Sequence, residues 1–131
     1  YPLDLTVSER PELLSVACSH DGYMRLQGKP VHRRSWQISP GHMEVADSVS
    51  GRGLPAVARY ILHPNVGVEQ VAPDSFHLRL ANGRPILVKV CKGLGRLERA
   101  AFAPEFGTVL PTQCIAVDLQ DGKAQIRLSW N

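Results

Sequence analysis

The stretch FHLRLANGRPILVKV, residues 76–90, decides the fold class of this chain. Over residues 76–80, apolar side chains alternate with polar ones, which is typical of a half-buried antiparallel strand. The dipeptide Asn82-Gly83 follows, and between two strand-like runs it is the strongest short-range sign of a β-hairpin. Residues 86–90 are more apolar throughout, which predicts a central strand. The stretch therefore predicts two paired antiparallel strands.

The same pattern extends over the rest of the chain. Residues 43–49 and 124–130 alternate with period two, and residues 115–119 predict a second central strand. Asp121-Gly122 is another hairpin signal, and Asp21-Gly22 and Pro40-Gly41 are further turn dipeptides. Residues 94–101 fit a short helix or a bulged strand. We predict an all-β fold, an antiparallel β-sandwich of about ten to twelve short strands.

The alternation also predicts which side chains form the core. Seven apolar residues fall on the inward row of the expected strands: Phe76, Leu78, Leu80, Val88, Val117, Ile126 and Leu128.

Length and composition indicate one globular domain. The chain has 131 residues and 14.4 kDa, so residues 1–131 are expected to form a single domain. Hydrophobic residues make up 44% and charged residues 21%, values that argue against disorder. No apolar run is long enough to span a bilayer, so we expect no membrane insertion. The chain starts at Tyr1 without a signal-peptide pattern, and we expect it to be a piece of a longer or processed protein.

The basic residues are mostly arginine. Of 15 basic residues 11 are Arg, and the formal net charge is +3. The planar guanidinium fits carboxylate, sulfate and phosphate groups. Aromatic residues make up only 6%, and the charge excess is mild, so we do not expect nucleic acid as a partner.

The three cysteines do not form a metal or redox motif. Cys18, Cys91 and Cys114 lie far apart and none belongs to a CxxC pair, which excludes a zinc ribbon. We expect three buried thiols, with one disulfide as the alternative. The five histidines show no metal-ligand spacing, so no metal or other cofactor is assigned.

The densest polar cluster begins with His20-Asp21-Gly22-Tyr23-Met24-Arg25 and continues with His32-Arg33-Arg34. On a strand over residues 31–38, His32, Arg34 and Trp36 share one face, and Arg33 and Ser35 share the other. Arginine could pair with the carboxylate or sulfate of an acidic sugar, while an aromatic ring stacks on the sugar. The alternative is that these side chains only join two strands at the surface.

Several ordered motifs resemble the C-terminal β-domain of heparinase II/III-like proteins. The likeness is collinear from about residue 15 to the end of the chain. It is carried by His20-Asp21-Gly22-Tyr23-x-Arg25-Leu26, Val31-x-Arg33-Arg34, Val45-x-Asp47, Gly51-x-Gly53, Leu62-His63-Pro64 and Ala103-Pro104-Glu105-Phe106-Gly107.

The resemblance implies a helical toroid upstream of this β-domain. Characterised members are polysaccharide lyases that act on uronate-containing polymers by β-elimination, and most of their catalytic residues belong to the helical domain. We therefore expect a periplasmic carbon–oxygen lyase as the full-length parent, and an isolated chain that is inactive. In this view the chain supports the helical domain and forms part of the wall of the sugar-binding cleft.

The residues expected to bind an acidic polysaccharide are His20, Tyr23, Arg33 and Arg34, and no catalytic residue is assigned. In some members the β-domain holds a structural zinc, and His20 could match one ligand by its place, but the other ligands would lie upstream. Two alternatives to a lyase domain are a non-catalytic carbohydrate-binding module and a structural interaction domain. The first would expose several aromatic residues on one face, and the second a large apolar patch.

Overall fold

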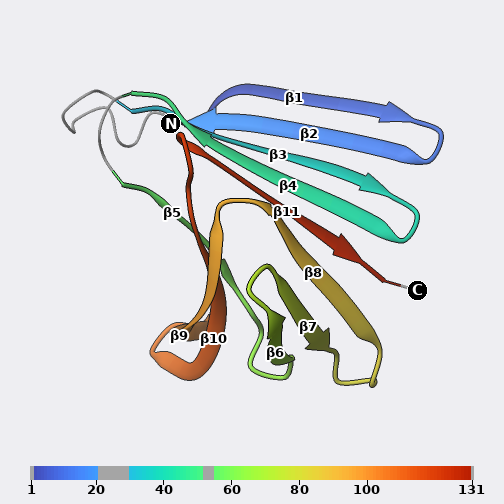
Figure 1. Cartoon of the computed structure of the whole chain (residues 1–131), viewed down its shortest axis with the longest axis vertical. Coiled ribbons are helices and arrows are strands. Elements are labelled where there is room, and N and C mark those ends of the chain that lie inside the picture. Colours follow the sequence, from blue (N-terminus) through green and yellow to red (C-terminus); the bar gives the residue numbers. More distant parts are fainter. Residues whose placement is uncertain (1, 21–29, 52–54, 131) are drawn as a thin grey trace.

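The computed structural model describes residues 2–20, 30–51 and 55–130. These residues form eleven strands and no helix (Figure 1). The strands are β1 (Pro2–Arg10), β2 (Leu13–His20), β3 (His32–Ser39), β4 (His42–Val49), β5 (Val57–Ile61), β6 (Gly67–Ala72), β7 (Ser75–Arg79), β8 (Pro85–Lys92), β9 (Leu94–Glu105), β10 (Thr108–Asp118) and β11 (Lys123–Ser129). The described part of the chain contains no helix long and apolar enough to cross a membrane.

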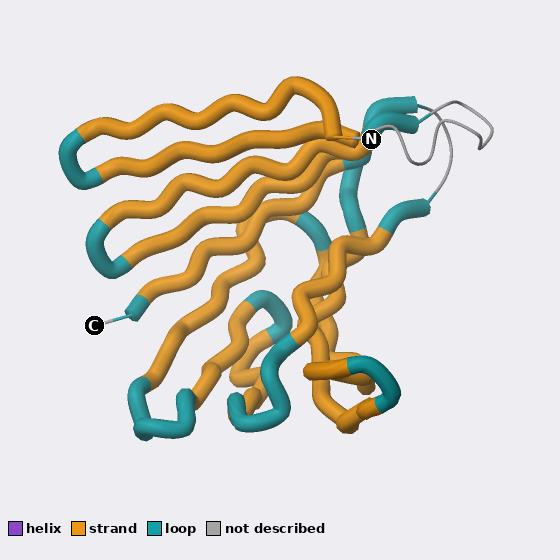
Figure 2. Tube along the Cα trace, turned by 180° about the vertical axis from the view of Figure 1, so that it is seen from behind, coloured by secondary structure: helices purple, strands orange, loops and turns teal. Residues whose placement is uncertain are grey.

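The strands form two antiparallel sheets. The larger sheet has the order β1-β2-β3-β4-β11-β8-β7-β6, and the smaller has the order β5-β10-β9. The large sheet fans out from β1 to β6, and the small sheet runs across its β6 half (Figure 2). This confirms the all-β, antiparallel fold. It also confirms β8 and β10 as strands with a neighbour on each side.

The core lies between the small sheet and the central strands of the large one. Its buried apolar residues come from β4, β5, β7, β8, β10 and β11, whereas β1, β2 and β3 contribute none. Of the predicted core residues, five are buried: Phe76, Leu78, Val88, Val117 and Ile126. Leu128 is partly buried against them. The inner face of β1 to β3 is therefore the less covered part of the sheet.

The prediction that Leu80 belongs to the core was wrong. The alternation continues to Leu80 in the sequence, but β7 ends one residue earlier, and Leu80 closes the turn instead. Its N–H donates to the carbonyl of Arg84 at 2.9 Å, and its carbonyl accepts from Gly83 at 2.8 Å. The hairpin that Asn82-Gly83 predicts is present between β7 and β8.

Asp121-Gly122 forms the tight turn that its sequence predicts. Asp121 has φ 53° and Gly122 has φ 72°, and positive φ at both central residues defines a type I′ turn. Gln120 and Lys123 exchange backbone hydrogen bonds of 2.9 and 3.0 Å across it. The turn leads the chain from β10 in the small sheet to β11 in the large one.

Residues 94–101 form part of a strand, so the strand alternative was right and the helix was not. This segment belongs to β9, which pairs with β10 over most of its length. A Cβ on Gly95 would lie 2.9 Å from Val90 Cγ2 and 3.2 Å from the ring of Phe76. The close approach of this backbone to the core, together with the long pairing to β10, overrides the local helical spacing.

The expectation of three buried thiols holds only for Cys114. All three cysteines are free, with Cys18 half-buried and Cys91 exposed. The pairing of β11 with β8 shifts between Ile126↔Val90 and Gln125↔Lys92, which leaves Cys91 without a partner residue. Cys91 also follows the buried Val90 in the alternation of β8, so its thiol faces away from the core.

Candidate functional site

A buried carboxylate forms the centre of the candidate site. On β4, Met43, Val45, Asp47 and Val49 occupy one row because side chains alternate along a strand. This row faces the small sheet, and the residue of Asp47 is only 2% exposed. A buried carboxylate needs hydrogen-bond donors around it, since an unpaired charge in the interior is very costly.

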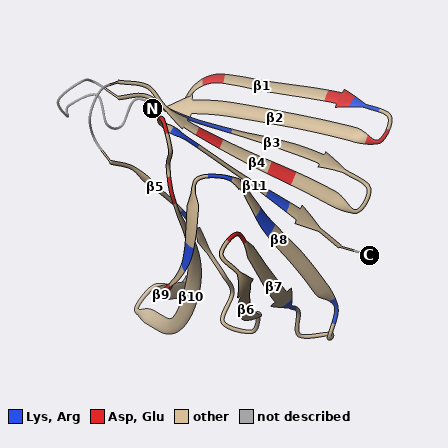
Figure 3. Ribbon diagram, in the orientation of Figure 1, with Lys and Arg blue, Asp and Glu red and all other residues tan. Residues whose placement is uncertain are grey.

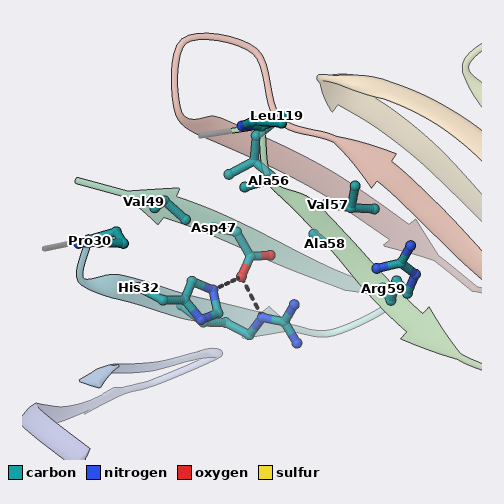
Figure 4. Close-up of a pocket in the computed structure, with 11 residues that line it drawn as sticks. Pro30, His32, Asp47, Val49, Ala56, Val57, Ala58, Arg59 and Leu119 are labelled. Atoms are coloured by element: carbon teal, nitrogen blue, oxygen red, sulfur yellow. Dashed lines mark hydrogen bonds and ion pairs between the residues drawn. The ribbon is translucent and has the colours of Figure 1, made fainter. Parts of the chain in front are cut away.

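Three side chains donate to Asp47. His32 Nε2 and Arg34 Nε each lie 2.7 Å from Oδ1, and the hydroxyl of Tyr60 donates to Oδ2 at 2.7 Å. Figure 4 shows the two contacts from β3 converging on the carboxylate. The pairing of Arg34 with Asp47 in the β3–β4 ladder explains why a cation stands beside this carboxylate.

Tyr60 connects the two sheets at this point. It belongs to β5 of the small sheet, whereas Asp47 belongs to β4 of the large one. The guanidinium carbon of Arg34 lies 4.9 Å from the centre of the Tyr60 ring, a cation–π distance. Burial, followed by the hydrogen bond to the negative Asp47, raises the pKa of Tyr60 above its usual value. Tyr60 is therefore a neutral donor at physiological pH.

The pKa of Asp47 is low although the group is buried. Burial alone would raise it, but the hydrogen bonds from His32, Arg34 and Tyr60, with the charge of Arg34, lower the pKa of Asp47 to about 2. Asp47 is thus a permanent carboxylate at neutral pH. It can orient His32 and Arg34, but it holds no proton to give to a substrate.

The polar network continues to the end of β2. His32 Nδ1 lies 2.9 Å from His20 Nε2, and the two rings meet edge to face with centroids 4.9 Å apart. Asp47, His32 and His20 are thus linked in series. Among residues 2–20, 30–51 and 55–130, no three His, Cys, Asp or Glu side chains converge in a way that could hold a metal ion.

An open pocket of about 550 Å³ lies beside this network. His32, Arg34 and Asp47 form its polar wall, and Arg59 of β5 also lines it, with its guanidinium paired to Glu98 of β9 at 3.6 Å. The remaining wall is largely apolar and comes from β4, β5 and the segments beside them: Pro30, Val49, Pro55, Ala56, Val57, Ala58 and Leu119 (Figure 4). An arginine and a histidine beside an apolar wall suit a ligand that carries a carboxylate or sulfate.

The structure brings together only part of the predicted site. His20 and Arg34 lie on the same face of the sheet and are joined through His32 and Asp47. Arg33 is on the opposite face, as the strand alternation predicts, and its Nη1 donates to Ser19 Oγ at 3.2 Å. Tyr23 lies outside the described residues. Sugar binding by these four residues stays a prediction.

Two central residues of the network were not assigned from the sequence. Asp47 carried a signal, because it is the one acidic residue in the row 43, 45, 47 and 49. No sequence signal indicated Tyr60, because the strand that Tyr60 faces is decided by the pairing of β5 within the small sheet. Outside this network, His63 has a local role, because its Nδ1 accepts from the N–H of Asn65 at 3.1 Å.

Acid should remove the stabilisation that Asp47 provides. Its pKa of about 2 lies below the usual aspartate pKa of 3.8, so the stabilisation is present above pH 3.8 and is lost as the pH falls through 2. We expect the wild type to lose about 2 kcal/mol more unfolding free energy than Asp47→Asn between pH 5 and pH 2, by the linkage relation. Urea unfolding at a series of pH values measures this, and parallel curves for the two proteins would contradict it.

Comparisons with known proteins identify the family. The family model described as Heparinase II/III-like, C-terminal, matches residues 3–130. No curated protein sequence matches the chain significantly. One solved structure of a heparinase III gene product is similar, with a TM-score of 0.75 and 12% identity over 98% of this chain and 21% of its own.

A structure of the same description with methylated lysines gives a TM-score of 0.70 and 11% identity, over 97% of this chain and 21% of its own. The chain thus spans about a fifth of the length of these structures, and the likeness supports the fold. The family match covers nearly the whole chain and the fold agrees with it, so the chain belongs to the Heparinase II/III-like, C-terminal family.

Proposed function

We propose that this chain is the C-terminal β-domain of a polysaccharide lyase that cleaves uronate-containing polymers by β-elimination. The observation that carries the proposal is the pocket beside Asp47, where His32 and Arg34 stand between a buried carboxylate and solvent. The family match supports the reaction class. The parent protein is proposed to act in the periplasm.

In this proposal the chain positions the sugar but does not perform the chemistry. β-Elimination needs a base at the proton next to the uronate carboxylate and a partner that neutralises the enolate-like charge. Arg34 is fixed by Asp47 and stacked on Tyr60, so it would bind a carboxylate in one orientation. Asp47 itself is too acidic to serve as a general acid. The base and acid are proposed to come from an upstream helical domain.

The exposed apolar residues on β1 support a role in carrying another domain. Leu5 and Val7 are 66% and 63% exposed on the edge strand β1. The adjacent strands β2 and β3 contribute no buried residue to the hydrophobic core. A carbohydrate-binding module is less well supported, because Phe106, the most exposed aromatic among the described residues, lies at the β9–β10 turn and not on a sheet face. We propose that the helical domain packs against the β1 side of the sheet.

The proposal is tested by the absorbance of the unsaturated product. The full-length protein should release it from at least one member of a panel of uronate polymers, including heparan sulfate and alginate, whereas residues 1–131 alone should not. Activity of the isolated chain would contradict the proposal that the base and acid come from the helical domain. A full-length protein without a helical domain, or inactive on the whole panel, would contradict the proposal.

Arg59 gives a sharper test of the pocket. Its side chain is 52% exposed and pairs with Glu98 at 3.6 Å, so its loss should leave stability nearly unchanged. We expect Arg59→Gln in the full-length enzyme to raise KM by about 3–10-fold with little change in kcat, since a binding contact is removed. Arg79→Gln, an exposed arginine on β7 outside this pocket, is the control. Equal effects of the two variants would exclude the pocket as a substrate site.

A further inference from the structure

A second hollow lies on the other face of the large sheet. It has a volume of about 560 Å³, and its polar side chains come from four strands, β3, β4, β8 and β11: Arg33, Ser35, Ser48, Lys92, Lys123 and Gln125. Asp47 borders it only through the backbone, because its carboxylate is turned to the opposite face and is held there by His32, Arg34 and Tyr60.

The strand pairing places the cations of this outer hollow in adjacent rows. Arg33 pairs with Ser48, and Ser48 pairs with Lys123, so the two cations stand two strands apart. Neighbouring strands are about 4.8 Å apart, which puts the backbones of Arg33 and Lys123 about 10 Å from each other. Lys92 pairs with Gln125 in the next row along β11. Figure 3 shows Lys and Arg on β3, β8 and β11 at this part of the sheet.

The positive charge of the outer hollow is only weakly compensated. Among the described residues, no carboxylate forms an ion pair with Arg33 or Lys123, and Arg33 is held in place by Ser19. Lys92 lies 3.5 Å from Asp121, whose side chain is 90% exposed, so solvent screens this pair. The carboxylate of Glu44, further along the face, is bound by Arg127 and Gln125.

The lining chemistry indicates the class of ligand. Guanidinium and ammonium groups bind carboxylates and sulfates, and the hydroxyl and amide groups of Ser48 and Gln125 suit sugar hydroxyls. No aromatic residue of the described chain lines the hollow, so this lining lacks the stacking platform typical of single-stranded nucleic acid sites. Cations spread over three strands fit a polymeric ligand that carries several anionic groups better than they fit a single small ion.

We propose that this outer hollow is a second binding site for an acidic polysaccharide, on the opposite face of the sheet from the Asp47 pocket. Arg33, Lys92 and Lys123 pair with carboxylate or sulfate groups, and Ser48 and Gln125 bind hydroxyls. A cationic binding site here does not depend on the lyase activity. Only the choice of a uronate polymer as its ligand rests on the proposed function. Such a site would hold the polymer near the enzyme between cleavage events.

Binding of a sulfated uronate hexasaccharide to the full-length protein tests the site, with inorganic sulfate and an oligodeoxynucleotide as alternative ligands. We expect Arg33→Gln/Lys92→Gln/Lys123→Gln to weaken hexasaccharide binding by about 10-fold or more, as paired charges are lost. The matched control, Arg79→Gln/Arg84→Gln/Lys89→Gln, removes the same charge from exposed positions outside the hollow. It should weaken binding by less than about 3-fold, as expected for screened charges.

Each outcome decides the proposal. Equal losses in the two triple variants, or tighter binding of the oligodeoxynucleotide than of the hexasaccharide, would overturn it, as would binding of inorganic sulfate alone. If Arg33→Gln disturbs folding, Lys92→Gln/Lys123→Gln must still weaken binding relative to Arg84→Gln/Lys89→Gln. The double variant Lys92→Gln/Lys123→Gln should leave turnover of short oligosaccharides unchanged. Loss of all lyase activity in the wild type would contradict the proposed function but not this site.

Discussion

Replacing Asp47 with alanine is expected to lower the free energy of unfolding by about 3–5 kcal/mol, because breaking a buried ion pair leaves its partners uncompensated. Three donors, on His32, Arg34 and Tyr60, would lose their acceptor at once. Urea unfolding at neutral pH measures the change. The matched control is Asp74→Ala, since Asp74 is exposed and should change stability by about 0.5 kcal/mol or less. Equal losses in the two variants would show that the network contributes nothing.

A double-mutant cycle isolates the link between the sheets. Tyr60→Phe removes only the hydroxyl that donates to Asp47, and Asp47→Asn keeps the shape of the acceptor without its charge. Because the two groups are in contact, the combined variant should lose less than the sum of the two single losses, with a coupling of about 0.5–3 kcal/mol. Additive losses would mean that the hydrogen bond does not stabilise the fold.

The second large effect is expected at Phe76. Its side chain is fully buried, and its ring lies against the backbone of β9 at Gly95, so Phe76→Ala should cost about 3–5 kcal/mol through lost burial and a cavity. Phe106→Ala is the matched control, because Phe106 is completely exposed at the β9–β10 turn. Thermal and urea unfolding of the two variants gives the comparison. Similar stabilities would place Phe76 outside the core.

The local part of this fold could be predicted, and the long-range part could not. Alternation over residues 76–80 and the turn at Asn82-Gly83 are encoded within a few residues, so the β7–β8 hairpin follows directly from them. By contrast, β11 inserts between β4 and β8, which lie far from it in the sequence. No periodicity indicates which distant strand is the neighbour, since every amphipathic strand presents the same kind of edge.

The candidate site shows the same division. The alternation correctly separates Arg33 from Arg34, because opposite faces follow from adjacent positions in one strand. The role of Arg34 depends on Asp47 in the next strand and on Tyr60 in the other sheet, and these contacts exist only after the sheets have packed. The signal for Asp47 was an acidic residue in an apolar row, which becomes informative once its donors are known.

The contact between Tyr60 and Asp47 also limits how the two layers can slide over each other. Apolar side chains on facing sheets lose little when one layer shifts, because their attraction has no direction. The hydrogen bond of 2.7 Å from Tyr60 to Asp47 is directional. A shift of β5 along β4 would therefore leave the charged Oδ2 of Asp47 in the interior without this donor. This single hydrogen bond therefore fixes the position of β5 relative to β4. Val57, Ala58 and Arg59, the residues just before Tyr60 on β5, line the pocket, so the same hydrogen bond also fixes the position of this wall.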